Sequence, residues 1–118
     1  MNTIDRQSVC DALRELGSID EQNRLWLSSG ANGAEVSSFA EAVEQLYTDT
    51  GLAEALECGR TGMSQELNER FRKLSQILKT VNHRHGPSCT IDDPAMTDVR
   101  LLANEILQFL EYESATTT

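Results

Sequence analysis

"SQELNERFRKLSQILKTV", residues 64–81, contains the most regular pattern of apolar residues in the chain and decides the fold class. Ser64 suits the N-cap of a helix, and Glu66 stands four residues before Arg70, a spacing that stabilises an exposed helix face. Apolar residues recur three or four positions apart within an arc of about 120°, as on a helix that packs through one side. They are Leu67, Phe71, Leu74, Ile77, Leu78 and Val81. We therefore expect an amphipathic helix over about residues 65–82.

A second long helix is expected near the C-terminus, over residues 94–112. Asp93 followed by Pro94 is a start signal, because proline is favoured at the first helical position. Leu101 and Tyr112 lie outside its main apolar arc, which spans about 160°. The residues in that arc are Met96, Val99, Leu102, Ala103, Ile106, Leu107, Phe109 and Leu110. Such a helix is either central to a bundle or shared with a second chain.

The N-terminal half predicts shorter helices. Ser18 with Glu21, and Ser38 with Glu41, each match the capping-box pattern at a helix start. A length of 118 residues suits one domain with one core. We predict an all-α fold: a compact bundle of about five helices, with the helices over about 65–82 and 94–112 as its spine. The domain is expected to cover residues 1–113, followed by a frayed tail over 114–118.

The composition excludes several classes of function. With 10 basic and 19 acidic residues the net charge is −9, which argues against binding to nucleic acid or to an anionic membrane surface. No leader segment and no membrane span is expected, because the chain lacks a long apolar run. Three cysteines, far apart and odd in number, do not form a disulfide framework. These features predict a protein of a reducing cytoplasm.

The charge is segregated along the chain. Residues 1–57 hold 11 acids and 3 bases, residues 58–91 hold 2 acids and 6 bases, and residues 92–118 hold 6 acids and 1 base. The helix predicted over 65–82 is therefore basic, and the rest of the chain is acidic. Salt bridges between this helix and its neighbours would neutralise some of the acids, but each such surface pair contributes little stability.

Residues 34–57 hold six acids and neither lysine nor arginine. The apolar residues of this stretch should face the core, which turns its carboxylates outward, and a like-charged surface destabilises a fold unless a basic partner covers it. A face that is merely solvated is the alternative. A tyrosine beside carboxylates suits an arginine of a partner. We predict a partner-binding surface with Tyr47 at its centre, formed by Glu41, Glu44, Tyr47, Asp49, Glu54 and Glu57.

The function predicted from this surface is non-catalytic protein binding. The most specific form is a bacterial immunity or antitoxin protein, without cofactor, that neutralises a basic toxin or nuclease. Enzymes that act on nucleic acid have positive clefts, which a small acidic protein can occupy. The alternative is a secretion or assembly chaperone that dimerises through the last helix and holds an unfolded client. The protein is thus expected to be a monomer or a homodimer.

Two further alternatives rest on weaker patterns. His83, His85 and Cys89 lie close together in sequence and are potential zinc ligands, although three ligands without a C-x-x-C pair fit known zinc patterns poorly. The same residues are the only hint of an enzyme. A DNA-binding regulator would read DNA through Arg72 and Lys79, which share a helix face, but the acidic remainder would repel phosphate.

Overall fold

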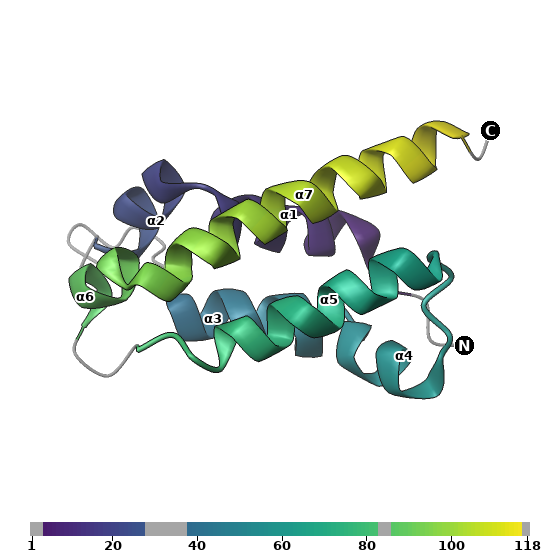
Figure 1. The fold of residues 1–118 in the computed structure, drawn as a ribbon, viewed down its shortest axis with the longest axis horizontal. Coiled ribbons are helices and arrows are strands. Elements are labelled where there is room, and N and C mark those ends of the chain that lie inside the picture. The colour runs from purple at the N-terminus through teal and green to yellow at the C-terminus, as the bar shows by residue number, and fades with distance from the viewer. Residues whose placement is uncertain (1–3, 28–37, 83–85, 117–118) are drawn as a thin grey trace.

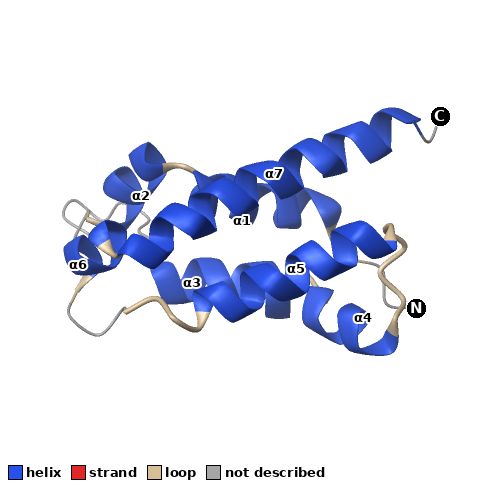
Figure 2. Cartoon of the chain, viewed as in Figure 1, coloured by secondary structure: helices blue, strands red, loops and turns tan. Residues whose placement is uncertain are grey.

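The computed structural model describes residues 4–27, 38–82 and 86–116, and all regular structure in these ranges is helical (Figure 1, Figure 2). The all-α prediction is therefore confirmed. These ranges contain seven α-helices and one π-helical turn, η2, where about five helices were expected. In chain order they are α1 (Arg6–Gly17), α2 (Ile19–Trp26), α3 (Phe39–Glu44), η2 (Gln45–Asp49), α4 (Leu52–Cys58), α5 (Gln65–Leu78), α6 (Pro87–Asp92) and α7 (Pro94–Thr116).

Three element boundaries differ from those predicted. α5 ends at Leu78 rather than near residue 82, because the N–H of Thr80 bonds to the carbonyl of Ile77 and closes a tighter turn. The short helix α6 lies in a stretch that composition alone would assign to a loop, and it begins at Pro87, where proline is tolerated. α7 continues to Thr116, so the part of the predicted frayed tail up to that residue is helical.

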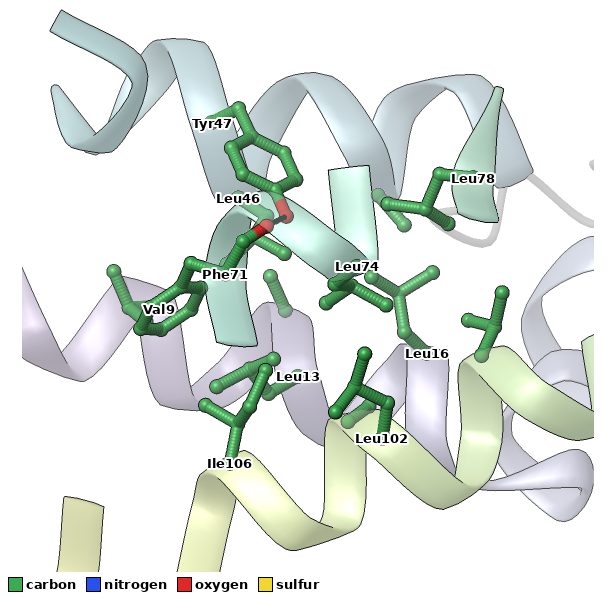
Figure 3. Packing of buried hydrophobic residues seen from close by; sticks show 14 of the residues in the cluster. Val9, Leu13, Leu16, Leu46, Tyr47, Phe71, Leu74, Leu78, Leu102 and Ile106 are labelled. Carbon is green, nitrogen blue, oxygen red and sulfur yellow. Dashed lines mark hydrogen bonds between the residues drawn. The ribbon is translucent and has the colours of Figure 1, made fainter. Parts of the chain in front are cut away.

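The core lies where α7 packs against both α1 and α5 (Figure 1). Figure 3 shows leucines of all three helices pointing into a common interior, to which Phe71 of α5 also belongs. Phe71 has no exposed surface. Each fully buried side chain of this kind stabilises the fold by about 1.5–3 kcal/mol. The labelled core residues from these helices are Val9, Leu13, Leu16, Phe71, Leu74, Leu78, Leu102 and Ile106.

Hydrogen bonds at the helix ends fix the directions of the shorter elements. The predicted caps are confirmed at Ser18, Ser38 and Ser64, whose hydroxyl oxygens accept bonds from backbone N–H groups at 3.1–3.2 Å. Asp93 accepts from the N–H groups of Asn82 and Ala95, each at 2.8 Å. These two bonds hold the pKa of the Asp93 carboxyl below its usual value and connect the segment after α5 to the start of α7.

A buried polar side chain joins α1, α2 and α7. Gln22 has no exposed surface, and its amide nitrogen donates to the carbonyls of Glu15 and Leu16 at 3.1 and 2.9 Å. Its amide oxygen accepts from Nε of Arg100 at 3.0 Å. Because the last carbonyls of α1 lack partners within their own helix, Gln22 satisfies groups that would otherwise be buried without a hydrogen bond.

Candidate functional site

The acidic stretch lies on three consecutive short elements, α3, η2 and α4, and the structure describes it from residue 38 onward. Glu35 falls outside the described residues. The five acids of the predicted site are all exposed, and we call them the acidic surface: Glu41, Glu44, Asp49, Glu54 and Glu57. Each carboxylate points outward because its helix or turn buries the side chains on the opposite side.

α3 is oriented by an aromatic contact and a small buried residue. Phe39 packs edge-on against Trp26, with ring centroids 6.0 Å apart, and Ala42 has no exposed surface. Trp26 itself belongs to the core, since its side chain is only 4% exposed. With this side of α3 turned inward, Glu41 and Glu44 face solvent, as expected.

The connection between α3 and α4 is a π-helical turn closed by Thr50. Its hydroxyl donates to the carbonyl of Leu46 at 2.6 Å and accepts from the N–H of Leu52 at 3.2 Å. Gly51, with φ of +80°, then precedes α4 in a conformation that favours glycine. Asp49 does not cap α4, because Gly51 occupies the cap position and Asp49 is the last residue of η2, with its side chain exposed.

α4 presents two carboxylates for the same reason as α3. Leu52, Ala55 and Leu56 are buried, and the helix has only seven residues, so its opposite side is solvated. Glu54 and Glu57, three positions apart, lie on that side and are exposed. The predicted outward direction of both residues is confirmed.

Tyr47 does not lie at the centre of an exposed surface. Its side chain is 9% exposed, and its hydroxyl donates to the backbone carbonyl of Phe71 at 2.6 Å (Figure 3). Burial raises the pKa of the Tyr47 hydroxyl above its ordinary value. The predicted role of Tyr47 as an accessible contact for a partner is therefore corrected: it fixes η2 to α5 beneath the acidic surface.

Two cations of α5 form contacts with groups other than the carboxylates of the acidic surface. Arg70 lies 3.1 Å from Glu66 of its own helix and 3.5 Å from Glu105 of α7. Arg72 donates to the backbone carbonyl of Leu56 at 2.9 Å, so it caps α4 instead of contacting a carboxylate. Arg72 is nevertheless exposed, and its role in the DNA-binding alternative stays a prediction.

Four carboxylates of the acidic surface form no ion pair with the basic helix among the described residues: Glu41, Glu44, Asp49 and Glu57. Within residues 4–27, 38–82 and 86–116, the ion pairs are Arg14–Asp11, Arg24–Glu21, Arg70–Glu66 and Arg70–Glu105. None of these pairs includes Glu41, Glu44, Asp49 or Glu57. The arrangement is one of like charges on solvated helix faces, which suits electrostatic binding of a basic surface.

A groove borders one side of the acidic surface, and sequence reasoning missed it. It has a volume of about 440 Å³ and lies between α3 with η2 and the C-terminal half of α5. Ala40, Val43 and Tyr47 line one wall, and Ser75 and Lys79 belong to the other. The spacing of the first three along a helical turn was the available signal, but no pattern in the sequence indicates which part of α5 lies opposite them.

The predicted metal ligands are not brought together in the part of the chain that can be described. His83 and His85 fall outside it, and Cys89 is exposed on α6. Among the residues that are placed, no group of three or more histidine, cysteine or acidic side chains is arranged to hold a metal ion.

No helix among the described residues is long and apolar enough to cross a membrane. Comparisons with models of protein families, with curated proteins and with solved structures found no match for this chain.

Proposed function

We propose that this chain is a non-catalytic inhibitor of the immunity or antitoxin type, which binds a basic partner such as a toxin or nuclease. Its docking residues are those of the acidic surface, and its proposed setting is a bacterial cytoplasm. One observation carries the proposal: Glu41, Glu44, Asp49 and Glu57 are exposed and unmatched by the cations of the described residues, although the basic helix α5 packs nearby.

Electrostatics gives the physical reason. Repulsion among like charges destabilises a compact state, so an uncovered acidic surface has a cost that a basic partner removes. Complementary charge also speeds encounter, with association rate constants that reach about 10⁸–10⁹ M⁻¹s⁻¹ at low salt. Fast capture suits an inhibitor, because it must reach a toxic enzyme before that enzyme finds its substrate. A protein with a net charge of −9 can occupy the positive cleft of a nuclease.

The test is capture of the partner with the tagged protein from a lysate of its source cells, at low and at high salt. An acidic-surface variant carries Glu41→Gln, Glu44→Gln, Asp49→Asn and Glu57→Gln, which remove four negative charges at almost constant shape. We expect one basic protein to be retained at low salt, released at high salt and lost with the variant. The purified partner should then lose its own activity when the wild-type protein is added.

Two results would overturn the proposal. One is that no basic protein is retained by the wild-type protein. The other is that the acidic-surface variant retains the same protein equally well, which would make the carboxylates a solubility feature. An apolar client bound without salt dependence would favour the chaperone instead.

A chaperone that dimerises through α7 is the second candidate, and one observation favours it. Leu101 and Tyr112 are 67% and 68% exposed, and between them Phe109 lies under the guanidinium of Arg70, 4.2 Å from its ring centroid. Large apolar side chains exposed on one face of a helix can take part in a protein interface. Light scattering after size exclusion tests this candidate: a dimer that becomes monomeric on Leu101→Glu supports it, and a wild-type monomer contradicts it.

A further inference from the structure

The groove beside the acidic surface has a floor that the fold holds in place. Tyr47 and Leu78 are only 9% and 4% exposed, yet both line it. The hydrogen bond from the Tyr47 hydroxyl to the carbonyl of Phe71 joins η2 to α5 (Figure 3). A side chain tied in this way keeps its ring in position, so the groove is formed before any ligand binds.

The groove combines an apolar interior with charged edges. Val43 is half-buried in its wall, while Glu44 on α3 and Lys79 on α5 are exposed at its two sides. The volume of about 440 Å³ lies within the range of roughly 300–1,000 Å³ that is usual for sites that enclose a small ligand. The groove therefore has room for one bulky side chain of a larger partner, but not for a whole helix.

We infer that this groove receives an apolar anchor residue from a basic, amphipathic segment of the partner, while Glu41 and Glu44 contact the lysines or arginines that flank the anchor. The inference rests on the proposed function, because it names the part of the partner that the acidic surface binds. Interfaces concentrate their binding energy in a few apolar or aromatic anchors that fill pockets with polar rims. The groove and its acidic edge have this composition.

Charge complementarity selects this occupant over the others. A second copy of this chain would bring another net charge of −9, and like charges placed together oppose association. An acidic segment would meet Glu41 and Glu44 with the same repulsion. A basic segment gains from both carboxylates, and Lys79 on the opposite wall directs its positive residues towards α3.

The probe for this test is a synthetic helical peptide of lysine and alanine with one central leucine. Two matched peptides replace the leucine by serine, or the lysines by glutamate. Binding to the isotope-labelled protein is followed by chemical shifts and by titration. We expect the leucine peptide to shift the amide signals of Val43, Thr48 and Ser75. The serine peptide should bind with an affinity at least about tenfold lower. The glutamate peptide should not bind.

Protein variants provide an independent readout. Ala40→Trp fills the groove from an exposed position and should weaken the leucine peptide by about tenfold. Ala53→Trp is the matched control, because Ala53 is an exposed helical alanine that does not line the groove, and it should leave the affinity unchanged. Lys79→Glu should strengthen binding and Glu44→Lys should weaken it.

Equal affinity of the leucine and serine peptides would overturn the inference, and so would signals in the groove that do not shift. The proposed function would survive either result if the acidic-surface variant still fails to retain the basic partner, since that capture does not depend on the groove. Conversely, groove binding by the leucine peptide with no basic partner in the lysate would overturn the proposed function alone. If Ala40→Trp fails to fold, the two peptides still decide the matter.

Discussion

The α5–α7 pair and the α3–η2–α4 segment are built in opposite ways. α5 and α7 have 14 and 23 residues and bury continuous apolar stripes, whereas α3, η2 and α4 have 6, 5 and 7 residues. Helices that short are unstable alone, so buried side chains such as Leu46 and Leu52, together with the hydrogen bond from Tyr47 to Phe71, hold them against the core. The contrast shows that the stability of the short segment comes from its inner side. Its outer carboxylates are left available for binding.

The largest effect is expected in the long pair. Phe71→Ala removes a ring with no exposed surface from the centre of the core and should lower the free energy of unfolding by about 3–5 kcal/mol. Leu101→Ala is the control on α7, because Leu101 is 67% exposed, and it should change stability by less than about 0.5 kcal/mol. Urea denaturation measures both. A similar loss for the two variants would show that the core is not centred where these helices meet.

A smaller loss is expected where α1 and α2 meet α7. Gln22→Ala leaves the carbonyls of Glu15 and Leu16 and the guanidinium of Arg100 without their buried partner, which should cost about 1–3 kcal/mol. The control is Gln76→Ala at an exposed position of α5, which should be almost neutral. Equal stability of the two variants in urea would mean that water replaces the Gln22 amide as the partner of these groups in Gln22→Ala.

Within the short segment, Tyr47→Phe isolates a single hydrogen bond. It keeps the ring and removes the hydroxyl that donates to the carbonyl of Phe71, so we expect a loss of about 1 kcal/mol at neutral pH. Tyr112→Phe, on a side chain that is 68% exposed, is the matched control. Urea denaturation of both variants should show a larger loss for Tyr47→Phe, because the hydroxyl of Tyr47 is buried and the side chain of Tyr112 is mostly exposed.

The same variant should also change the dependence of stability on alkaline pH. In the unfolded chain a tyrosine loses its proton near pH 10, whereas burial raises the pKa of Tyr47 in the folded protein. Stability is therefore independent of this group below about pH 10 and falls above it, by up to about 1.4 kcal/mol per pH unit. Tyr47→Phe should remove this part of the decline and Tyr112→Phe should retain it. Identical alkaline profiles for wild type and Tyr47→Phe would contradict the burial of the hydroxyl.

The smallest effect on stability is expected at the acidic surface itself. The acidic-surface variant, with Glu41, Glu44, Asp49 and Glu57 neutralised, should unfold within about 0.5 kcal/mol of the wild type, or be slightly more stable because repulsion is relieved. Thermal unfolding at low and high salt measures this. A large loss would mean that these carboxylates support the fold, and it would remove the contrast between the two regions.

Periodicity and capping chemistry predicted much of the fold. The arc of apolar residues around Phe71 placed the inner face of α5, and the serines at positions 18, 38 and 64 marked three helix starts. The outward direction of Glu41 and Glu44 followed from the same reasoning, because the buried positions of α3 leave them no other side. These features are local, so the sequence within a few residues determines them.

The features that were missed depend on residues far apart in the chain. The side chain of Tyr47 turns inward because its hydroxyl reaches a carbonyl 24 residues later, on α5. Arg72 contacts the end of α4 through the carbonyl of Leu56, 16 residues earlier in the chain, which no local pattern reveals. The groove beside Lys79 has the same origin, since its walls come from α3 with η2 and from α5.

The decisive measurement compares two variants that lose the same charge from different places. One is the acidic-surface variant, and the other carries Asp20→Asn, Glu69→Gln, Asp98→Asn and Glu111→Gln, at exposed acids on α2, α5 and α7. Retention of the basic partner from lysate is quantified for both by mass spectrometry. We expect the second variant to retain the partner as the wild type does and the first to lose it. Equal loss would show that net charge rather than the surface of α3, η2 and α4 governs binding. Retention of the partner by both variants would show that neither the net charge nor this surface governs it.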